Sequence, residues 1–449
     1  MSATATIDPS SPDPTPAPVA AARRTRRGLD RFQSIGVLFG ILGVVLVGYV
    51  TPNLENETRA FTLEVGRDPA QISFSPRVPI AAIGTFFVLV AVATLVAGRS
   101  SRWERYARSG LGVAAVLMAP LLVILSLALS ERPSTNLVQL IVESLRLGTP
   151  FALGAMAGLW CERSGVVNIG IEGMMLSAAG VGFTVYAVMG NAQDAPWLWI
   201  GILVAVLTGG LVATLHAVVS VTFRVDQIIS GVVINLLALG MTSFLRSQVI
   251  VPEGISTGTS TSELSIPLLS DIPIIGEQLF TNKPIFFSMF VIVALTWFVL
   301  FRTPWGLRVR SVGENPHAAE TLGIDVIKVR YQAVILGGLI AGLGGAWFSM
   351  EGQGGFQDNM VGGAGFIALA AVIFGRWRPW SAFAGAMLFG FTRALGTRLQ
   401  ILDVSIGDFS IPSEFWQSLP YVVTIVVVAG AVGRSVAPAA VGQPYERSH

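Results

Sequence analysis

The sequence predicts an all-α fold, a polytopic integral membrane helical bundle with about 12 spans. Of the 449 residues, 52% are hydrophobic and only 12% are charged, whereas a soluble globular chain carries about 25% charged residues. The mean hydropathy is +0.67. Apolar runs of the roughly 20 residues that a transmembrane helix needs recur along most of the chain. The longest polar stretches are a tail and a few loops, so we expect no soluble domain of any size.

The N-terminal tail, residues 1–33, is predicted to be disordered and basic. Residues 1–22 are rich in Ala, Pro, Ser and Thr and lack hydrophobic periodicity, which is typical of disorder. The run RRTRR at 23–27 then precedes the first apolar run, residues 34–50. That run is long for a signal peptide, and no small-residue cleavage site follows it cleanly. We therefore expect a retained first helix.

Further apolar runs predict the other spans. They lie at residues 79–97, 109–129, 136–160, 166–190, 197–222, 227–249, 284–302, 331–350, 364–375, 379–395 and 419–437. The runs at 364–375 and 379–395 are short enough for half-helices or a re-entrant pair. The run at 136–160 contains Pro150, which interrupts helical hydrogen bonding. It predicts either one helix or an interfacial amphipathic helix followed by a short span.

The positions of the arginines predict which side of the membrane each loop faces. Arginines gather in alternate loops, at 98–108, 161–165, 223–226, 303–330 and 376–378. The loops between them, such as 51–78 and 250–283, are mixed in sign or nearly uncharged. Because cytoplasmic loops carry the excess of Lys and Arg, this pattern predicts that both the N- and the C-terminus are cytoplasmic.

The longest cytoplasmic loop, residues 302–330, contains signals for a short and sharply bounded helix. Asn315 is suited to cap its start, and Pro316 to its first position. Gly323 supplies a left-handed stop, and Asp325 is placed to cap the next membrane helix. A helix of residues 316–322 is about 10 Å long. It predicts either a docking element for a partner or a turn that only orients its flanking helices.

Polar residues occur inside the apolar stretch VVNIGIEGMML. If a helix begins near Val166, Asn168 and Glu172 are four residues apart and share one helix face. A charge near a helix centre costs about 2.5–3.5 kcal/mol, so Glu172 is expected to face the bundle interior or a water-filled cavity. Gly173 beside it indicates a helix break or a close approach by a neighbouring backbone.

Each of these polar residues has a functional and a structural interpretation. Asn168, Glu172 and Gly173 are candidates for a polar face along a transport pathway. Alternatively, Glu172 is satisfied by a neighbour such as Arg163 or by a backbone amide. Asn235 is an intramembrane amide that predicts either a contact with a polar ligand or an interhelical hydrogen bond. For the single intramembrane His216 we expect a packed, hydrogen-bonded histidine.

Other chemistry is excluded by what the sequence lacks. Cys161 is the one cysteine, so no intrachain disulfide forms. No His, Cys or acidic cluster has metal-site spacing, and we expect no metal and no cofactor. The two lysines, Lys283 and Lys328, do not follow glycine, so the chain has no phosphate-binding loop. Gly338 and Gly342 predict close helix packing. The net charge of +2 gives no reason to expect a nucleic-acid partner.

Four segments together resemble a known family. They are ERSGVVNIGIEGMML (162–176), DQIISGVVINLLALGM (226–241), RTPWGLRVRSVGENPHAAETLGIDV (302–326) and IALAAVIFGRW (367–377). They are similar to ABC-importer permeases of the simple-sugar and nucleoside branch, which is related to the branched-chain amino-acid permeases. The likeness is greatest to one of the two paired permease subunits of bacterial BmpA-type nucleoside importers, and it covers roughly residues 137–437.

The resemblance implies a domain plan and partners. Residues 34–135 are membrane helices that extend the family core, residues 136–437 are the permease core with a cytoplasmic coupling loop at 302–330, and residues 438–449 are a tail. The expected partners are ABC ATPase subunits, a second, paralogous permease in a heterodimer, and an extracytoplasmic substrate-binding lipoprotein. The family's coupling helix corresponds to residues 313–322, around Gly313, Glu314, Asn315, Pro316, Ala318 and Ala319.

The resulting functional expectation is a non-enzymatic permease subunit in the bacterial cell membrane. It would move nucleosides inward by alternating access, with ATP hydrolysed by separate subunits. A ribose- or galactose-type sugar permease is the alternative within this class. A secondary transporter that couples to protons through Glu172 and a membrane structural or receptor protein are the alternatives outside it.

Overall fold

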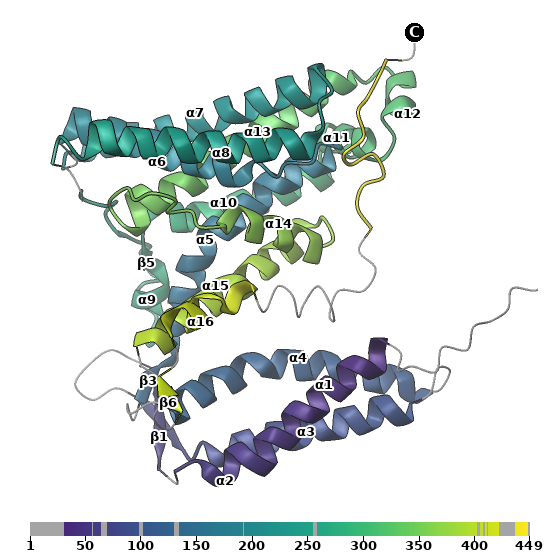
Figure 1. Cartoon of the computed structure of the whole chain (residues 1–449), viewed down its shortest axis with the longest axis vertical. Helices are drawn as coiled ribbons and strands as arrows, with labels where there is room; N and C mark the ends of the chain where they lie inside the picture. The colour runs from purple at the N-terminus through teal and green to yellow at the C-terminus, as the bar shows by residue number, and fades with distance from the viewer. Residues whose placement is uncertain are drawn as a thin grey trace, which may run out of the picture.

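Helices dominate the computed structural model (Figure 1). It describes residues 31–55, 57–63, 70–97, 102–129, 134–191, 193–254, 258–401, 405–406, 409–410, 412–421 and 436–447. The tail expected at 1–33 therefore lies outside the described residues, apart from residues 31–33, which begin the first helix. Most of the last expected span, 419–437, lies outside them as well.

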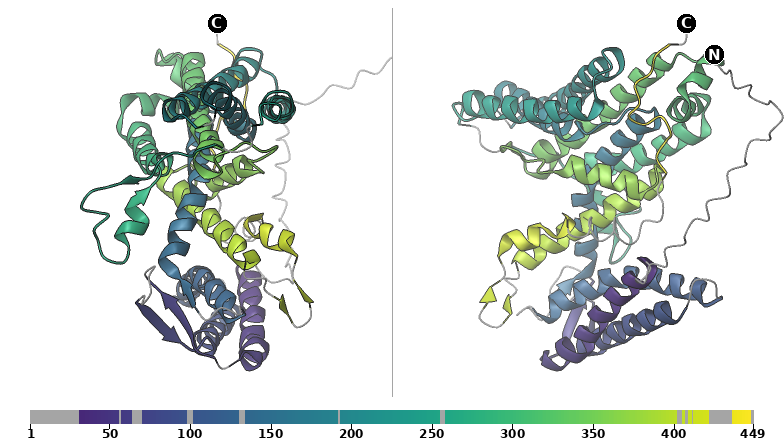
Figure 2. Two further views of the ribbon diagram at one scale, coloured as in Figure 1. Left: turned by 90° about the vertical axis from the view of Figure 1, so that its left-hand side faces the viewer. Right: turned by 45° about the vertical axis from the view of Figure 1, so that its right-hand side comes forward.

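Three long helices at the N-terminal end have a hydrophobic core of their own. They are α1 (Arg31–Val45), continued by the π-helical turn η1 (Leu46–Val50) and α2 (Thr51–Asn53), then α3 (Arg77–Val96) and α4 (Arg102–Ala128). Leu46, Phe87 and Leu121 are buried where these helices meet. The helices lie at one end of the molecule in every view (Figures 1 and 2). The boundary expected at residue 135 stays a prediction.

The larger bundle contains the remaining long helices. They are α5 (Leu137–Arg163), α6 (Ile171–Gly190), α7 (Ala195–Ala217) with η2 (Val218–Thr222), α8 (Gln227–Leu245) with η3 (Arg246–Ile250), α10 (Pro284–Arg302), α13 (Val326–Ala346) with η4 (Trp347–Gly352), α14 (Ala364–Phe374) and α15 (Pro379–Ile401). α5 is one continuous helix with Pro150 inside it, so the alternative of an interfacial helix followed by a short span is wrong. α14 has 11 residues, as expected of a half-helix, whereas α15 has 23.

Length and composition agree with a membrane protein. Within the described residues, nine helices are long and apolar enough to cross a bilayer. Glycines let two of them meet closely: a Cβ on Gly338 of α13 would lie 2.1 Å from the Cβ of Ala213 on α7, and one on Gly342 would lie 2.6 Å from the Ala205 carbonyl. The helix-packing role predicted for Gly338 and Gly342 is confirmed.

Short strands and helices collect on the side of the membrane predicted to be external. β1 (Arg59–Thr62) pairs antiparallel with β2 (Gln71–Phe74) and parallel with β3 (Ser134–Asn136). Two-residue strands form the pairs β4 (Leu264–Ser265) with β5 (Thr281–Asn282) and β6 (Ser405–Ile406) with β7 (Phe409–Ser410), near α9 (Gly276–Phe280) and α16 (Ser413–Gln417). The opposite side carries α11 (Pro304–Glu314), α12 (Pro316–Thr321) and the yellow segment of residues 436–447 (Figure 1).

Candidate functional site

A loop of residues 164–170 connects α5 to α6 where a helix was expected. α6 begins at Ile171, not near Val166. Asn168 consequently lies in the loop and Glu172 in the first turn of the helix, so the prediction that they share one helix face is wrong. The loop is nevertheless buried or half-buried along its whole length.

Gly165 is the local reason that the helix stops. Its φ of +90° lies in the left-handed region, which only glycine adopts readily. A Cβ at this position would also lie 2.9 Å from Nη2 of Arg330 and 3.2 Å from the carbonyl oxygen of Ala440. The chain therefore leaves α5 by a turn that is too crowded for any side chain.

Side chains of α7 and α8 satisfy the backbone of this loop. The Val167 amide donates to Oε1 of Gln227 at 2.6 Å, and the Val167 carbonyl lies 3.0 Å from Nε2 of His216. Nδ2 of Asn235 donates to the Ile169 carbonyl at 3.1 Å. Irregular backbone is tolerated at membrane depth only where protein or water replaces the missing helical bonds. Three side chains from other helices do so here.

His216 and Asn235 each make a second bond that fixes their orientation. Because a carbonyl only accepts, Nε2 of His216 donates to Val167, and Nδ1 accepts from the Ser230 hydroxyl at 3.0 Å. The prediction of a packed, hydrogen-bonded histidine is confirmed. Oδ1 of Asn235 accepts from the Gly173 amide at 2.8 Å, so Asn235 makes the interhelical hydrogen bonds that were one of its two predicted roles.

Glu172 binds the start of the half-helix α14. Its Oε1 accepts from the Gly363 amide and its Oε2 from the Gly365 amide, each at 2.7 Å. The first amides of a helix have no intrahelical partner, and the helix dipole favours a negative charge there. With 11 residues, α14 is about 16 Å long, roughly half of the ~30 Å hydrocarbon core. The carboxylate thus lies at the start of an apolar helix that is too short to cross the bilayer.

Two residues that the sequence analysis did not single out lie at the same place. The guanidinium carbon of Arg393 on α15 is 5.8 Å from the ring centre of Phe151 and interacts electrostatically with Glu172. The hydroxyl of Tyr421 donates to the Gly362 carbonyl at 3.0 Å. An arginine inside an apolar run is a signal that identifies Arg393, whereas nothing in the local sequence distinguishes Tyr421.

Asn168 and Gly173 complete the set of predicted pathway residues. Asn168 is fully buried, and its Nδ2 lies 3.3 Å from Sγ of Cys161. A Cβ on Gly173 would lie 2.8 Å from the Ile234 carbonyl, so the expected close approach of a neighbouring backbone is observed. Asn168, Glu172, Gly173 and Asn235 therefore gather around one buried loop. Their assignment to a substrate pathway stays a prediction.

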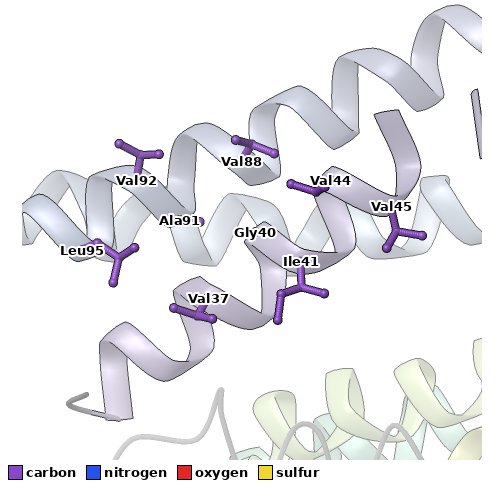
Figure 3. Close-up of a pocket in the computed structure, with 9 residues that line it drawn as sticks. All are labelled: Val37, Gly40, Ile41, Val44, Val45, Val88, Ala91, Val92 and Leu95. Carbon is purple, nitrogen blue, oxygen red and sulfur yellow. The ribbon is translucent and has the colours of Figure 1, made fainter. Parts of the chain in front are cut away.

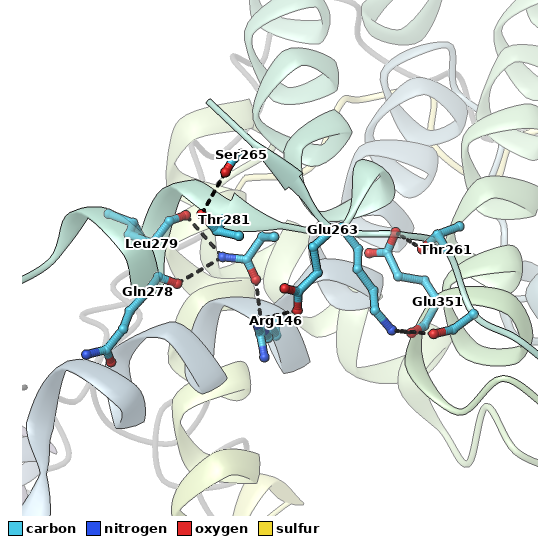
Figure 4. A network of polar contacts seen from close by, with 11 residues as sticks. Arg146, Thr261, Glu263, Ser265, Gln278, Leu279, Thr281 and Glu351 are labelled. Atoms are coloured by element: carbon cyan, nitrogen blue, oxygen red, sulfur yellow. Dashed lines mark hydrogen bonds and ion pairs between the residues drawn. The ribbon is translucent and has the colours of Figure 1, made fainter. Parts of the chain in front are cut away.

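A second carboxylate, that of Glu351, belongs to the polar network in Figure 4 and caps a helix near the external side. Oε2 of Glu351 accepts from the Ile285 amide at 2.7 Å, and Oε1 accepts from the Phe286 amide at 2.9 Å, at the start of α10. Nζ of Lys283 donates to the Glu351 carbonyl at 2.5 Å and to the Ser260 hydroxyl at 2.9 Å. Burial lowers the pKa of Lys283, and the Glu351 charge opposes that shift. This network fixes the external loops on the bundle.

The cytoplasmic loop folds as its sequence predicts. Oδ1 of Asn315 caps α12 by accepting from the Ala318 amide at 3.0 Å. Gly323 has a φ of +77° and stops the chain beyond α12, and Oδ1 of Asp325 accepts from the Lys328 amide at 3.1 Å to cap α13. Ala318 is exposed, whereas Ala319 is 2% exposed and packs inward. α12 therefore presents a short free face to the cytoplasm.

The end of α11 lies against the α5–α6 turn. A Cβ on Gly313 would lie 2.2 Å from the Arg163 carbonyl, so only glycine fits. Arg163 in turn lies 3.9 Å from the Glu314 carboxylate and donates from Nε and Nη2 to the Trp377 carbonyl at 2.9 and 2.6 Å. The Trp377 indole donates to the carboxylate of Glu162. The loop of residues 302–330, the α5–α6 turn and the α14–α15 turn thus form one packed unit.

A groove of about 360 Å³ between α1 and α3 has a different character (Figure 3). Its lining residues are Val37, Gly40, Ile41, Val44, Val45, Val88, Ala91, Val92 and Leu95. All of them are apolar, so the groove offers no group to orient a hydrogen-bonding solute. It is not a candidate solute site.

Comparison with known proteins identifies the family. Residues 140–428 match the model described as "Branched-chain amino acid transport system / permease component". The chain belongs to this permease family. It is therefore a multi-pass protein of the cell membrane and a transporter subunit, not an enzyme.

Named relatives of the permease are ABC transporter subunits. It is 41% identical to the nucleoside ABC transporter permease protein NupC of Lactococcus lactis subsp. cremoris over 70% of this chain and 98% of NupC. It is 38% identical to the guanosine ABC transporter permease protein NupQ of Bacillus subtilis over 67% of this chain and 94% of NupQ. It is 27% identical to the glucose ABC transporter permease protein TsgB13 of Haloferax volcanii over 53% of this chain and 63% of TsgB13. No solved structure matches it.

Proposed function

We propose that the permease is the membrane subunit of an ATP-binding-cassette importer and moves nucleosides across the bacterial cell membrane. The observation that carries the proposal is the 41% identity to a nucleoside permease across 98% of that protein's length. The short helix α12 supports this proposal, because it is capped and has an exposed face on the predicted cytoplasmic side. A partner that hydrolyses ATP needs such a rigid element on which to act. The chain itself contains no phosphate-binding loop.

The proposed complex contains ATPase subunits, a second, paralogous permease and an extracytoplasmic substrate-binding lipoprotein. Two guanosine permease proteins of Bacillus subtilis both resemble this chain, NupQ at 38% and NupP at 29% identity. A pair of related permeases in one organism supports a heterodimer. The ATPase subunits dock on residues 313–322, where Gly313, Glu314, Asn315, Pro316, Ala318 and Ala319 form and anchor the coupling helix.

The proposed mechanism begins with movement of α12. Gly313 and Glu314 contact Arg163, so a shift of the coupling helix would displace the α5–α6 loop directly. From that loop, Glu172 holds the start of α14. The substrate pathway runs beside this helix start, along the polar cluster of Asn168, Glu172, Gly173 and Asn235. Discontinuous helices of this kind commonly mark the site of alternating access in transporters.

A pathway with amides, backbone dipoles and few charges suits a neutral solute rich in hydrogen-bonding groups. This chemistry fits a nucleoside and also a sugar, and the 27% identity to a glucose permease keeps a simple-sugar substrate as the second candidate. A proton-coupled carrier would need the Glu172 carboxylate to be accessible, whereas it is 7% exposed and bound to two amides.

Uptake into proteoliposomes tests the proposal. The complete complex is reconstituted, and radiolabelled guanosine and glucose are offered with ATP and, separately, with a proton gradient alone. We expect ATP-dependent guanosine uptake. Uptake of glucose alone would identify a sugar permease, and uptake driven by the proton gradient without ATPase subunits would contradict the proposal.

A coupling-helix variant tests the docking role. Glu314→Ala with Asn315→Ala removes the contact with Arg163 and the cap of α12, so we expect the complex to hydrolyse ATP without transport. The matched control is Glu277→Ala with Gln278→Ala, an acid and an amide in the short external helix α9. Normal transport by the Glu314/Asn315 variant would refute docking on α12.

A further inference from the structure

Residues 436–447, here named the strap, lie across the cytoplasmic face of the bundle. In Figure 1 this yellow segment runs beside α11 and α12. It contacts the α5–α6 turn at Gly165, the α11–α12 junction at Gly313, and α13 at Arg330. It also reaches the loop between α7 and α8 at Arg224. One short segment thus joins four separate cytoplasmic parts of the permease.

Backbone hydrogen bonds fix the path of the strap. The Ala440 amide donates to the Gly313 carbonyl at 2.9 Å, and the Gly442 amide donates to the Gly165 carbonyl at 3.1 Å. Nη1 of Arg330 donates to the Gln443 carbonyl at 3.1 Å. Gly313 and Gly165, which accept the two bonds from the strap amides, are positions where an added Cβ would lie within 3 Å of neighbouring atoms. The strap therefore completes the closely packed junction between the coupling loop and the α5–α6 turn.

Tyr445 anchors the strap on α12. Its side chain is 5% exposed, although the residue lies in an extended segment on the surface. The ring lies 5.4 Å from the ring of His317, and the Arg330 guanidinium carbon is 5.9 Å from its centre. The hydroxyl hydrogen-bonds to Glu320; burial first, and then this carboxylate, raise the pKa of Tyr445 to about 12. The phenol stays protonated and donates to α12.

The ion pairs of the strap contribute less than this anchor. Arg224 and Glu446 lie 2.6 Å apart, and Arg447 and Asp325 lie 3.7 Å apart, but all four side chains are substantially exposed. Exposed pairs of this kind contribute little to stability and are screened by salt. The aromatic contact and the buried hydroxyl of Tyr445 are protected from solvent, so they dominate the attachment to α12.

We propose that the strap holds α12 in the orientation that transmits ATPase movement, with Tyr445 as its positioning residue. This inference rests on the proposed docking of the ATPase on α12. Without the anchor, α12 keeps its cap and its exposed face, so an ATPase subunit still binds. However, α12 then lacks its direct contact with the strap, and part of its movement no longer reaches the α5–α6 loop.

The test measures the ratio of solute transported to ATP hydrolysed in the reconstituted complex. For Tyr445→Ala we expect this ratio to fall about tenfold, the scale of losing one aromatic contact and one hydrogen bond, with ATPase binding retained. Tyr445→Phe keeps the ring and is expected to restore most of the ratio. Val436→Ala, at a strap residue that is 81% exposed, is the control and is expected to match the wild type. An unchanged ratio in Tyr445→Ala would overturn the proposal.

A second variant tests the strap proposal if Tyr445→Ala does not accumulate in the membrane. Ala440→Pro removes the amide that donates to Gly313 and changes no residue of the membrane helices, and the same fall in ratio is expected. Failure of the two inferences is distinguishable. Normal transport by the Glu314/Asn315 variant refutes docking on α12. If that variant is uncoupled while Tyr445→Ala and Ala440→Pro keep the wild-type ratio, the strap proposal alone is wrong.

Discussion

Replacing Glu172 by Gln distinguishes two roles of its carboxylate, which are holding the start of α14 and contacting the solute. Both oxygens of Glu172 are 2.7 Å from amide nitrogens of Gly363 and Gly365. The carbonyl oxygen of Gln can still accept from one of these amides. Its NH₂ group would face the other amide, so two hydrogen-bond donors would oppose each other and that amide would stay unpaired. The loss of one charge-assisted bond and the burial of one unpaired amide cost about 2–4 kcal/mol together. At about 2.1 cal/mol/K of unfolding entropy per residue, this cost lowers the thermal midpoint of a 449-residue chain by about 2–4 °C.

The assay pairs thermal unfolding in detergent with transport kinetics, and Glu351→Gln is the matched control. Glu351 caps α10 through two amides in the same way, on the external side of the bundle. If Glu172 acts by holding α14, both variants lower the midpoint by similar amounts and leave the KM for nucleoside unchanged. A wild-type midpoint in Glu172→Gln together with a raised KM would refute this reasoning and identify a direct contact with solute.

Two further substitutions test the loop and the junction beside it. Asn235→Leu keeps the branched shape of the side chain but removes the bonds to Ile169 and Gly173, and we expect it to lower stability by about 2–4 kcal/mol. Leu236→Ala, at an exposed position of the same helix, is the control, and equal thermal midpoints would contradict the role of Asn235. Gly313→Ala places a Cβ 2.2 Å from a carbonyl, so we expect lost transport with ATP hydrolysis retained. Gly240→Ala is the control, because its added Cβ meets nothing within 4 Å, and it is expected to transport normally. Normal transport by Gly313→Ala would contradict the reasoning that the contact between α11 and the α5–α6 turn requires glycine.

Local chemistry made the cytoplasmic loop predictable from the sequence. A cap needs only a short polar side chain three residues before the amide it accepts from, and a left-handed stop needs only a glycine. Asn315, Gly323 and Asp325 each meet these conditions within a few residues of chain. The same reasoning gives the order of the spans, because apolar length and arginine position are also local properties.

The partners of the polar membrane residues were not predictable in the same way. Glu172 binds amides 191 and 193 residues further along the chain, and no local pattern specifies that pairing. Expecting a helix from Val166 failed for a related reason. The segment has helix-compatible hydrophobicity, but Gly165 turns the chain, and His216, Gln227 and Asn235 on other helices replace the bonds that a helix would make.

The buried loop explains why polar side chains occur in so apolar a bundle. A continuous helix from Arg163 into α6 would satisfy its own amides and carbonyls and need no help from α7 or α8. In a buried irregular segment, each unpaired backbone group costs several kcal/mol, so side chains with donors and acceptors must surround it. The irregular loop can therefore contact both the strap and α8. Its Gly165 carbonyl accepts a hydrogen bond from the strap, and its Val167 amide and Ile169 carbonyl bind side chains of α8. The polar residues around it are required by this irregular backbone, whichever solute the permease carries.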